Sequence, residues 1–399
     1  MPAAVIVDAV RTAGGKRNGK LSGWHPADLA GEILKALVER NDLDPAEVDD
    51  VILGCVMQIG AQGVNVARNA VLAAGFPESV PATTVDRQCG SSQQSVHFAA
   101  QGVMAGAYDV VIAGGVEVMS LVPMGATMLA PNTGMPFGPK MMARYQAAGG
   151  LVPQGISAEM ICDRWNLSRQ DLDAYGAQSQ ARALRASEEG RFEREIIPMA
   201  VKVRDRDSGQ VLKPDGMIGR DEGIRPGTTV EVLSSLKPAF KPDGGKVTAG
   251  NSSQITDGAS AALIMSEEKA AALGLVPRAR FCSFALAGVD PVLMLTGPIP
   301  ATAQVLERAK LRLDDIALIE INEAFASVVL AWERELHPDM ARVNVNGGAI
   351  ALGHPLGASG TKLLATLLNE LERSGGRYGL QTMCEGGGLA NAMIIERLG

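Results

Sequence analysis

The order of apolar and polar positions predicts alternating strands and helices along the first part of the chain. Apolar runs at residues 4–10, 48–56, 81–85 and 108–120 are typical of buried strands. Between the first two runs, residues 27–40 have a helical period that places on one face Leu29, Ile33, Leu34, Leu37 and Val38. Because strands that alternate with helices usually lie side by side, this pattern predicts a buried and mainly parallel sheet in an α/β protein.

The pattern changes between residues 121 and 249, where Met, Pro, Gly and charged residues replace the strand signal. One helix is predicted from Ser168, because Ser-x-x-Asp resembles a capping box. A segment of this length without strand periodicity usually carries a binding or interface function in an α/β protein. We therefore interpret it as a large insertion.

After about Val276 the opening pattern returns. Residues 301–311 (ATAQVLERAKL) and 313–327 (LDDIALIEINEAFAS) repeat the order of the earlier helix and of LDPAEVDDVILG. Each half also has a strand that ends in Cys followed by Gly or Ser, in DRQCGSS and QTMCEGGG. The chain therefore contains an approximate duplication, and stacking of the halves would bring Cys89 and Cys384 together.

Composition narrows the choice of partner and compartment. The 399 residues include 46% hydrophobic and 20% charged residues, which allows a large core and roughly two or three domains. A net charge of −7 argues against a nucleic-acid partner, because phosphate binding depends on a basic surface. The first residues have no basic region followed by an apolar segment, and no apolar run reaches roughly 18 residues. We therefore expect no membrane insertion and a cytoplasmic location.

The cysteines do not indicate a disulfide framework or a zinc site. They are five in number and widely spaced, and no two of them form a CxxC pair. A reducing compartment fits this usage best. Their positions are Cys55, Cys89, Cys162, Cys282 and Cys384.

Cys89 and His354 have the context of a nucleophile and its base. Cys89 lies between a predicted strand and a predicted helix, where free N–H groups and the helix dipole are expected to lower the pKa of the thiol. A buried structural cysteine is the alternative. His354 lies in a glycine-rich loop, GGAIALGHPLGASG, and its neutral imidazole could take the proton of a thiol. Structural roles are preferred for the other histidines, His25, His97 and His337.

Cys384 and Asn322 are candidates for the remaining chemistry. Three glycines after Cys384 would expose N–H groups for an oxyanion, and the thiol could move a proton. A redox dithiol with Cys89 is the alternative, although such pairs are usually close in sequence. The amide of Asn322 could donate to an oxyanion, and Glu323 could be a base, but such a pair is otherwise an ordinary helix cap.

Together these motifs resemble the thiolase family along nearly the whole chain. DRQCGSS resembles the acyl-cysteine motif, GGVEVMS the strand after it, NEAF the asparagine motif, GGAIALGHPLGASG the histidine motif and CEGGG the second-cysteine motif, in the family order. The resemblance implies the thiolase fold, with two βαβαβαββ halves stacked in five layers, α-β-α-β-α. It implies an N-terminal half at residues 1–120, completed by 250–275, a loop domain covering CoA at 121–249, and a C-terminal half at 276–399. Members of the family are homodimers or homotetramers.

The resemblance also implies a role for each motif residue. Cys89 would attack the 3-keto carbon after His354 takes its proton, and the acyl group on sulfur would then pass to CoA. Cys384 would protonate the departing carbanion, or remove the α-proton of acetyl-CoA in the reverse reaction. One oxyanion site would use His354 and a water held by Asn322, and the other the N–H groups of Cys89 and Gly386. No metal or bound cofactor is implied, and CoA is a co-substrate.

Five positions are implied to line the path of CoA by their resemblance to the family's loop-domain and channel segments. Arg225, in DEGIRPGTT, is a candidate near the nucleotide. Phe240, Ala249 and Ser253 would lie along the adenine and pantetheine, and Phe325 would line the same channel.

Three departures from the family pattern bear on specificity. Pro153, Gln154 and Gly155 stand where acetoacetyl-CoA thiolases commonly carry His-Met-Gly, which indicates a wider acyl pocket. Glu385 replaces a small or apolar residue and could raise the pKa of the neighbouring Cys384 thiol. Ser92 replaces a common glycine. KRNGKLSGWHPADLAG and INEAFASVVLAW are more similar to degradative thiolases, including those that act on steroid side chains in actinobacteria.

The sequence therefore predicts an acyl-CoA:acetyl-CoA C-acyltransferase that works mainly in the thiolysis direction and yields acetyl-CoA or propionyl-CoA and a shortened acyl-CoA. A biosynthetic acetoacetyl-CoA thiolase is the nearest alternative. A ketoacyl synthase of the same superfamily is another, but such synthases commonly use Cys-His-His or Cys-His-Asn, and Cys384 argues against that set. A non-catalytic acyl-CoA or lipid carrier should have lost a catalytic position, whereas all of them are present here.

Overall fold

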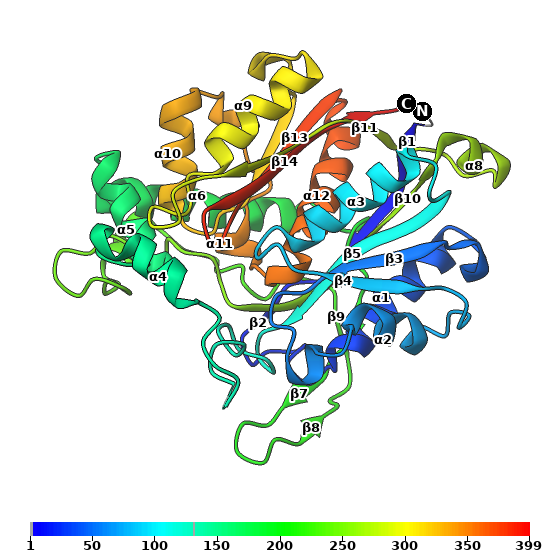
Figure 1. The fold of residues 1–399 in the computed structure, drawn as a ribbon, viewed down its shortest axis with the longest axis horizontal. Helices are drawn as coiled ribbons and strands as arrows, with labels where there is room; N and C mark the ends of the chain where they lie inside the picture. The colour runs from blue at the N-terminus through cyan, green and yellow to red at the C-terminus, as the bar shows by residue number, and fades with distance from the viewer. Residues whose placement is uncertain (1–2, 131) are drawn as a thin grey trace.

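The computed structural model describes residues 3–130 and 132–399. Within these residues, ten strands form one mixed sheet with helices on both faces (Figure 1). The short strand β2 (Gly15–Lys16) pairs with β10 beside the main path. Along that path the strands follow the order β12 (Leu318–Ile321), β13 (Tyr378–Glu385), β14 (Leu389–Arg397), β11 (Ala279–Gly288), β1 (Ala4–Arg11), β10 (Thr256–Ser266), β5 (Val110–Val118), β3 (Asp50–Gly54) and β4 (Ala82–Val85).

The two halves of the sheet have the same strand order, as the predicted duplication requires. In the first half β1 is followed by β10, β5, β3 and β4, and in the second half β11 is followed by β14, β13 and β12. An isolated bridge between Ile319 and Val343 takes the place of a fifth strand in the second half. β1 and β11 pair through two residues each and so join the halves. The limits given above for the halves and the loop domain remain a prediction.

The expectation of a mainly parallel sheet was wrong. Parallel pairing is confined to β3 with β4 and β5, and to β12 with β13. The other pairs of the large sheet are antiparallel. Helices cover both faces of most strands, so the parallel pair β3 with β5 and the antiparallel pairs β1 with β10 and β13 with β14 are alike buried along nearly their whole length, and the hydrophobic pattern there does not reveal strand direction. Only β4, at the edge, and β11, whose side chains alternate between buried and exposed, differ. The turn at residues 386–388 is too short for a crossover, so β13 and β14 must be antiparallel.

Three hydrophobic cores separate five layers, α-β-α-β-α. Helices α1 (Pro26–Arg40) and α2 (Val66–Ala73) pack on the outer face of the first half-sheet. Helices α3 (Ser91–Met104) and α12 (Ser359–Ser374) lie between the half-sheets. In that central core, Val96 of α3 and Leu364 of α12 share contacts with Val111 of β5 and Ile395 of β14. Helices α9 (Pro298–Ala309) and α10 (Ala326–Leu336) cover the second half-sheet.

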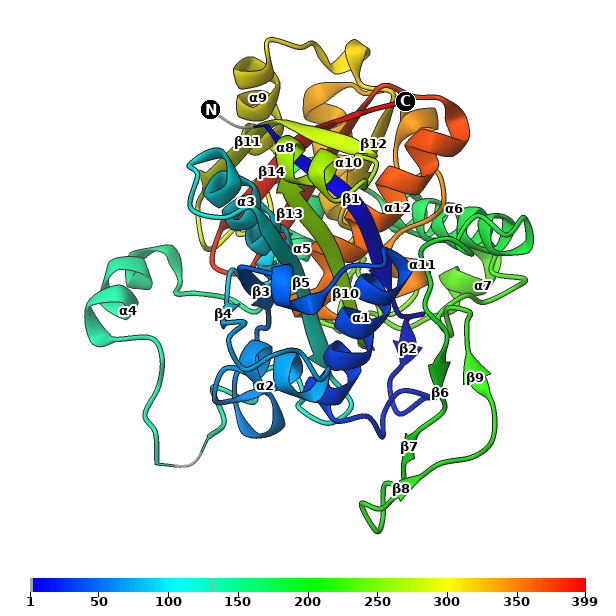
Figure 2. The same ribbon diagram turned by 90° about the vertical axis from the view of Figure 1, so that its right-hand side faces the viewer.

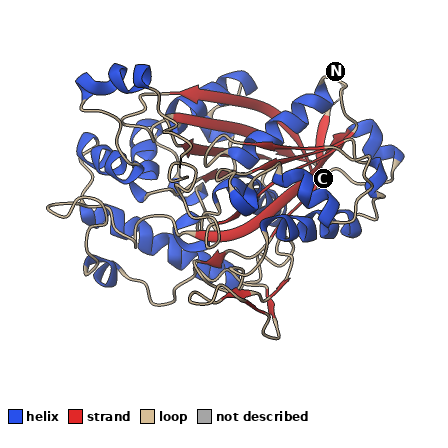
Figure 3. Cartoon of the chain, turned by 60° about the horizontal axis from the view of Figure 1, so that its bottom comes forward, coloured by secondary structure: helices blue, strands red, loops and turns tan. Residues whose placement is uncertain are grey.

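The segment between β5 and β10 adds helices and short hairpins to this frame (Figures 2 and 3). Figure 2 shows that α4 and the β7–β8 hairpin project from the frame at different places, whereas α5 and α6 share a core with α10. The Ser168 capping box with Asp171 is confirmed at the start of α6. The elements of this segment are α4 (Pro139–Tyr145), α5 (Gln154–Arg164), α6 (Arg169–Glu188), β6 (Met199–Ala200), β7 (Val203–Arg204), β8 (Val211–Leu212), β9 (Met217–Ile218) and α7 (Val230–Ser234).

The remaining elements are short. They are the helices α8 (Glu267–Ala272) and α11 (Ala349–Leu352) and the 3-10 turns Pro45–Glu47, Gly60–Gln62, Gln146–Ala148, Leu313–Asp315, Met340–Arg342 and Leu356–Ala358. In the part of the chain that the structure describes, no helix combines the length and apolarity needed to cross a bilayer.

Candidate active site

Four connections at the ends of core strands and helices carry the predicted catalytic residues. Cys89 lies between β4 and α3, Asn322 directly follows β12, His354 lies between α11 and α12, and Cys384 lies near the end of β13. Each of these side chains is buried, with at most 5% exposure. Because these are connections rather than element interiors, the side chains can converge although they are distant in sequence.

The structure brings these connections together. Cys89 shares an apolar cluster with Leu356, from the histidine loop, and with Met383, which precedes Cys384. The main-chain N–H groups of Gly386 and of Cys89 itself, and the side-chain amide of Gln154, lie near the Cys89 thiol and act to lower its pKa. Cys89 and Gly386 are the donors that the family resemblance implies for an oxyanion site, and that role stays a prediction.

The turn before Cys89 is held in an unusual conformation. Gln88 has a φ of 48°, in the left-handed region that non-glycine residues seldom adopt. The hydroxyl of Ser91 accepts from the Arg87 N–H at 3.0 Å and donates to the Gln88 carbonyl at 2.6 Å. These bonds fix the turn that presents the thiol at the start of α3.

The expected lowering of the Cys89 pKa was wrong. Burial, together with the carboxylate of Glu385, raises the pKa of the thiol to about 12, although the N–H groups nearby act to lower it. The effect of burial therefore exceeds that of the helix start. Cys89 is protonated at neutral pH, so it needs a base before it can attack.

His354 has the protonation state and tautomer of such a base. Burial and the nearby charge of Lys362 lower the pKa of His354 to about 3, so the imidazole is neutral. Its Nδ1 atom lies 2.5 Å from the Ser359 hydroxyl, which itself donates to the Pro355 carbonyl at 2.9 Å. Since that hydroxyl has only one proton, it must accept from Nδ1–H. The Nε2 atom therefore has the free lone pair.

Asn322 faces this lone pair, and Glu323 does not belong to the reacting groups. The Nδ2 atom of Asn322 lies 3.4 Å from His354 Nε2. The Glu323 carboxylate accepts from Tyr175, Ser179 and Asn344 side chains and from the Ile350 N–H. It therefore ties α6 to the main chain around α11. The helix-cap interpretation of this pair is wrong, because Phe325 occupies the N-cap of α10. The hydrogen bonds of Glu323 disfavour its role as a base.

Cys384 is a second buried thiol beside the first. Burial raises its pKa well above the usual range, and the charges of Cys89 and Glu385 raise it further, as was predicted for Glu385. Both cysteines are free thiols. A redox pair normally contains one thiol of lowered pKa, so the raised values do not support the redox interpretation. Gly387 and Gly388 have φ values of 81° and 79°, which the tight turn after Cys384 requires.

Glu385 is buried without a hydrogen-bond partner among the described residues. Its side chain is 0% exposed, and neither carboxylate oxygen is paired. A Cβ atom on Gly90 would lie only 2.0 Å from its Oε1 atom, so the carboxyl group packs directly on the residue after Cys89. Burial raises the pKa of Glu385 well above the usual range, and Asp86 raises it whereas Arg87 lowers it.

Other positioning groups were missed from the sequence. Glu117 of β5 accepts from the N–H groups of Val56, Met57 and Gly357 and so anchors the histidine loop to the first half-sheet. Ser359 lies five residues after His354, and that spacing beside a candidate base could have indicated it. Glu117 is the one acidic residue of the motif GGVEVMS, and its place in an otherwise apolar strand could have indicated it.

The structural interpretation of the other histidines agrees with their surroundings. His25 caps α1 by accepting from the Ala27 N–H, and His337 ends α10 in a left-handed conformation. His97 is fully buried in α3, with its ring 4.8 Å from that of Phe284.

The candidate CoA positions lie on neighbouring segments. The rings of Phe240 and Phe325 are 6.0 Å apart, edge to face, and the Ser253 N–H donates to the carbonyl before Phe325. Ala249 is exposed on the segment that pairs with residue 239. Arg225 is exposed, and its Nη2 atom is 3.4 Å from Gln254, next to Ser253. In the described ranges, no three His, Cys, Asp or Glu side chains are grouped as metal ligands.

Comparison with known proteins agrees with this geometry. Residues 4–268 match the family model of the thiolase N-terminal domain, and residues 275–397 that of the thiolase C-terminal domain. The chain is 50% identical to steroid 3-ketoacyl-CoA thiolase FadA6 of Mycobacterium tuberculosis, over 100% of this chain and 95% of the relative. It is 46% identical to an acetyl-CoA acetyltransferase of Pseudomonas aeruginosa, with 100% of both chains covered.

A solved structure is also similar. The acetyl-CoA acetyltransferase of Bacillus anthracis superposes with a TM-score of 0.88 at 38% identity, covering 100% of this chain and 99% of that one. The five-layer arrangement, the order of the motifs and these matches lead to one conclusion: the chain belongs to the thiolase family of acyltransferases.

Proposed function

We propose that this protein is a 3-ketoacyl-CoA thiolase that cleaves its substrate with CoA through an acyl group on Cys89. The observation that carries the proposal is the neutral His354 with an unprotonated Nε2 atom, in a buried site that also contains two protonated thiols. Relatives named 3-ketoacyl-CoA thiolase support it at 44% to 50% identity over at least 99% of this chain.

The reaction follows from these protonation states. His354 Nε2 takes the Cys89 proton, and the thiolate adds to the 3-keto carbon. The bond between the α-carbon and the keto carbon breaks, and Cys384 gives its proton to the carbanion, which leaves as acetyl-CoA or propionyl-CoA. Cys384 then takes the thiol proton of an incoming CoA, whose thiolate removes the acyl group from Cys89. Return of the proton from His354 restores the Cys89 thiol.

Oxyanions form in both stages and need separate donors. In the first stage the N–H groups of Cys89 and Gly386 would stabilise the oxyanion formed from the 3-keto oxygen, and a water held by Asn322 with His354 would stabilise the enolate oxygen of the departing CoA thioester. In the second stage the N–H groups of Cys89 and Gly386 would stabilise the oxyanion that forms when CoA attacks the acyl thioester on Cys89. The two sites together allow cleavage and, in reverse, Claisen condensation. CoA is a co-substrate in both directions, with Arg225, Phe240, Ala249, Ser253 and Phe325 along its path.

The substrate class that we favour is a 3-ketoacyl-CoA with a long or bulky acyl group, including one derived from a steroid side chain. Gln154 lies near the Cys89 thiol, and the Phe240 ring packs on Gly155, so this segment borders the reacting thiol. The relative named for steroid substrates supports this choice. A homodimer or homotetramer in the cytoplasm completes the proposal.

A biosynthetic acetoacetyl-CoA thiolase is the second candidate, and the relative named acetyl-CoA acetyltransferase favours it. Thiolysis rates with acetoacetyl-CoA, medium-chain and steroid-derived 3-ketoacyl-CoA esters distinguish the two. We expect a higher kcat/KM for the larger esters, and no turnover by Cys89→Ala. Turnover of acetoacetyl-CoA alone would favour the biosynthetic enzyme, and no turnover with intact CoA binding would favour a carrier.

A further inference from the structure

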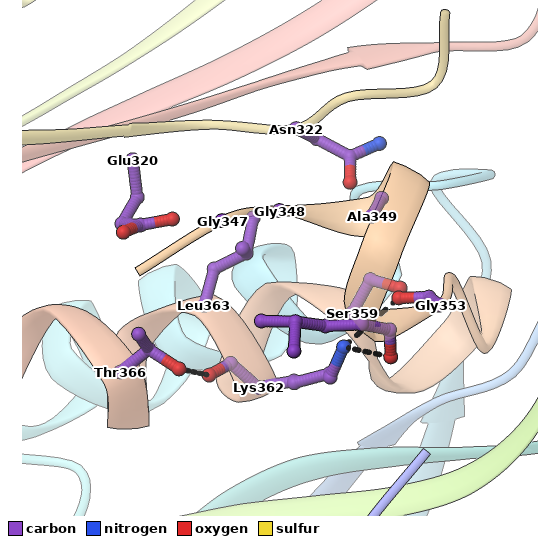
Figure 4. A pocket seen from close by; sticks show the side chains of 11 residues that line it. Glu320, Asn322, Gly347, Gly348, Ala349, Gly353, Ser359, Lys362, Leu363 and Thr366 are labelled. Atoms are coloured by element: carbon purple, nitrogen blue, oxygen red, sulfur yellow. Dashed lines mark hydrogen bonds between the residues drawn. The ribbon is translucent and has the colours of Figure 1, made fainter. Parts of the chain in front are cut away.

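A buried lysine contacts the main chain directly before His354. Lys362 of α12 is 6% exposed, and its Nζ atom donates to the carbonyls of Leu352 and Gly353 at 2.8 and 2.9 Å. Figure 4 shows its ammonium group pointing toward these oxygens, near Ser359. These residues line a small cavity that also borders Asn322. A single side chain therefore holds the two residues that lead into the histidine.

Burial lowers the pKa of Lys362 to about 8, although Asp221 and Glu195 raise it, so the ammonium group is mainly charged at neutral pH. Arg11 pairs with Glu195 at 2.7 Å and with Asp221 at 2.8 Å, and all three side chains are at most 3% exposed. A Cβ atom on Gly14 would lie 2.5 Å from the Leu352 carbonyl and 3.2 Å from Asp221, which places the Lys362-bound carbonyl beside this ion pair. The two cations, Arg11 and Lys362, thus face two carboxylates.

A third carboxyl group borders the same cavity. Glu320 is 3% exposed, and its Oε2 atom has no hydrogen-bond partner among the described residues. Burial and the neighbouring Glu323, Glu195 and Glu370 raise the pKa of Glu320 well above its usual range, although Lys362 lowers it. No hydrogen bond joins Glu320 to the histidine loop among the described residues, so Glu320 borders the cavity without holding that loop.

We propose that Lys362 is a positioning residue of the Cys89–His354 pair, which fixes the approach of the main chain to His354 and disfavours the imidazolium form through its charge. This inference rests on the proposed role of His354 as the base for Cys89. The neighbouring charged groups that shift the pKa of Lys362 are Asp221, Arg11, Glu195 and Glu320. Lys362 is in turn the charged group that lowers the pKa of His354.

The two effects of Lys362 have opposite consequences for Cys89, and this makes them separable. Lys362→Met keeps the length of the side chain and removes both hydrogen bonds and the charge. Loss of positioning should lower kcat for thiolysis by about 10- to 100-fold, because small misplacements of reacting groups are costly. Loss of the charge should favour the thiolate–imidazolium pair, so alkylation of Cys89 by iodoacetamide should become faster near pH 6.

The experiment measures both quantities in wild type, Lys362→Met and Glu320→Gln. Glu320→Gln is the matched control, because it alters the same cavity, keeps the size of the side chain and removes no hydrogen bond to the histidine loop. We expect it to retain wild-type kcat and alkylation rates. A lower kcat together with slower alkylation of Cys89 in Lys362→Met would indicate general disruption and overturn the proposal. An unchanged kcat in Lys362→Met would overturn it too, as would an equal loss of kcat in Glu320→Gln.

Wild-type turnover tests the proposed function separately. If wild type does not cleave any 3-ketoacyl-CoA ester, the proposed function fails, whatever the variants do. If wild type is active and Lys362→Met matches it in kcat and alkylation, only the role of Lys362 fails. If Lys362→Met does not fold, Lys362→Arg replaces it, because arginine keeps the charge and can donate to both carbonyls. The proposal then requires that the rate of Cys89 alkylation depends on pH as in wild type, and a shifted pH dependence contradicts it.

Discussion

The hydroxyl oxygen of Ser359 lies 2.5 Å from Nδ1 of His354 and donates its only proton to the Pro355 carbonyl. This relationship sets the tautomer of the imidazole and leaves Nε2 free for the Cys89 proton. A neutral base with a fixed tautomer is what a thiol with a pKa of about 12 needs at neutral pH.

Ser359→Ala should therefore slow the enzyme without abolishing it. Without its acceptor, Nδ1–H is no longer fixed and the free lone pair is on Nε2 for only part of the time, so we expect a loss of about tenfold in the rate of Cys89 acylation. Single-turnover kinetics measure this step. Ser283→Ala is a matched control, because Ser283 is also buried but its hydroxyl is unpaired among the described residues. Equal rates in wild type and Ser359→Ala would contradict the tautomer argument.

Cys384→Ala should separate acyl transfer from carbon–carbon bond cleavage. The variant retains Cys89 and His354, so an activated acyl donor should still form an acyl-thioester. Cleavage of a 3-ketoacyl-CoA should fall by about 10²- to 10⁴-fold, because the carbanion loses its proton donor. Stopped-flow acylation and steady-state thiolysis provide the two rates. A parallel loss of both would assign Cys384 to another role.

Glu385→Gln should change thiol reactivity only at high pH. The carboxylate of Glu385 raises the pKa of Cys89 and of Cys384, but it does so only when ionised. Since burial raises the pKa of Glu385 itself well above the usual range, wild type and variant should react alike with iodoacetamide at low pH. At higher pH the variant should react faster, because no like charge opposes the thiolate. Identical profiles at every pH would refute this account of Glu385.

Asp221→Asn should destabilise the fold, since it leaves Arg11 buried with one carboxylate. Removing one partner of a buried pair costs about 3–5 kcal/mol. Burial acts to raise the pKa of Asp221, but Arg11 and Lys362 hold it below its usual range. The contribution of Asp221 to the free energy of unfolding is therefore present above the unfolded-state pKa of about 3.9 and is lost as pH falls through the lowered pKa of the folded state. Thermal unfolding at pH 7 and pH 3.5 checks this, with Asp215→Asn at an exposed position as control.

Much of the fold could be predicted because its signals are local. The helix at residues 27–40 and the capping box at Ser168 depend on neighbouring residues, and both are confirmed. Strand direction is different, because it depends on connections rather than on periodicity. The three-residue turn after Glu385 is too short for a crossover and so indicates antiparallel strands, but the apolar pattern of β13 and β14 looks the same for either direction.

The sequence motifs predicted which residues belong to the candidate site, but not how burial shifts the pKa values of their side chains. Cys89, Asn322, His354 and Cys384 stand in recognisable motifs, and the structure brings them together. The direction of the Cys89 pKa was wrong, because burial and the distant Glu385 outweigh the local helix start. Lys362 resembles a solvated charge in the sequence. Its burial depends on Asp221 and Glu195, which no local pattern connects to it.

The central claim is that Cys89 carries the acyl group, and the intact mass of the protein tests it most directly. Wild type is incubated with a panel of 3-ketoacyl-CoA and acyl-CoA esters without free CoA, and any adduct is mapped to a peptide. We predict one acyl mass on the peptide that contains Cys89, absent in Cys89→Ala and removed by added CoA. An acyl mass on the Cys384 peptide instead, or no adduct from any ester while CoA still binds, would contradict the account.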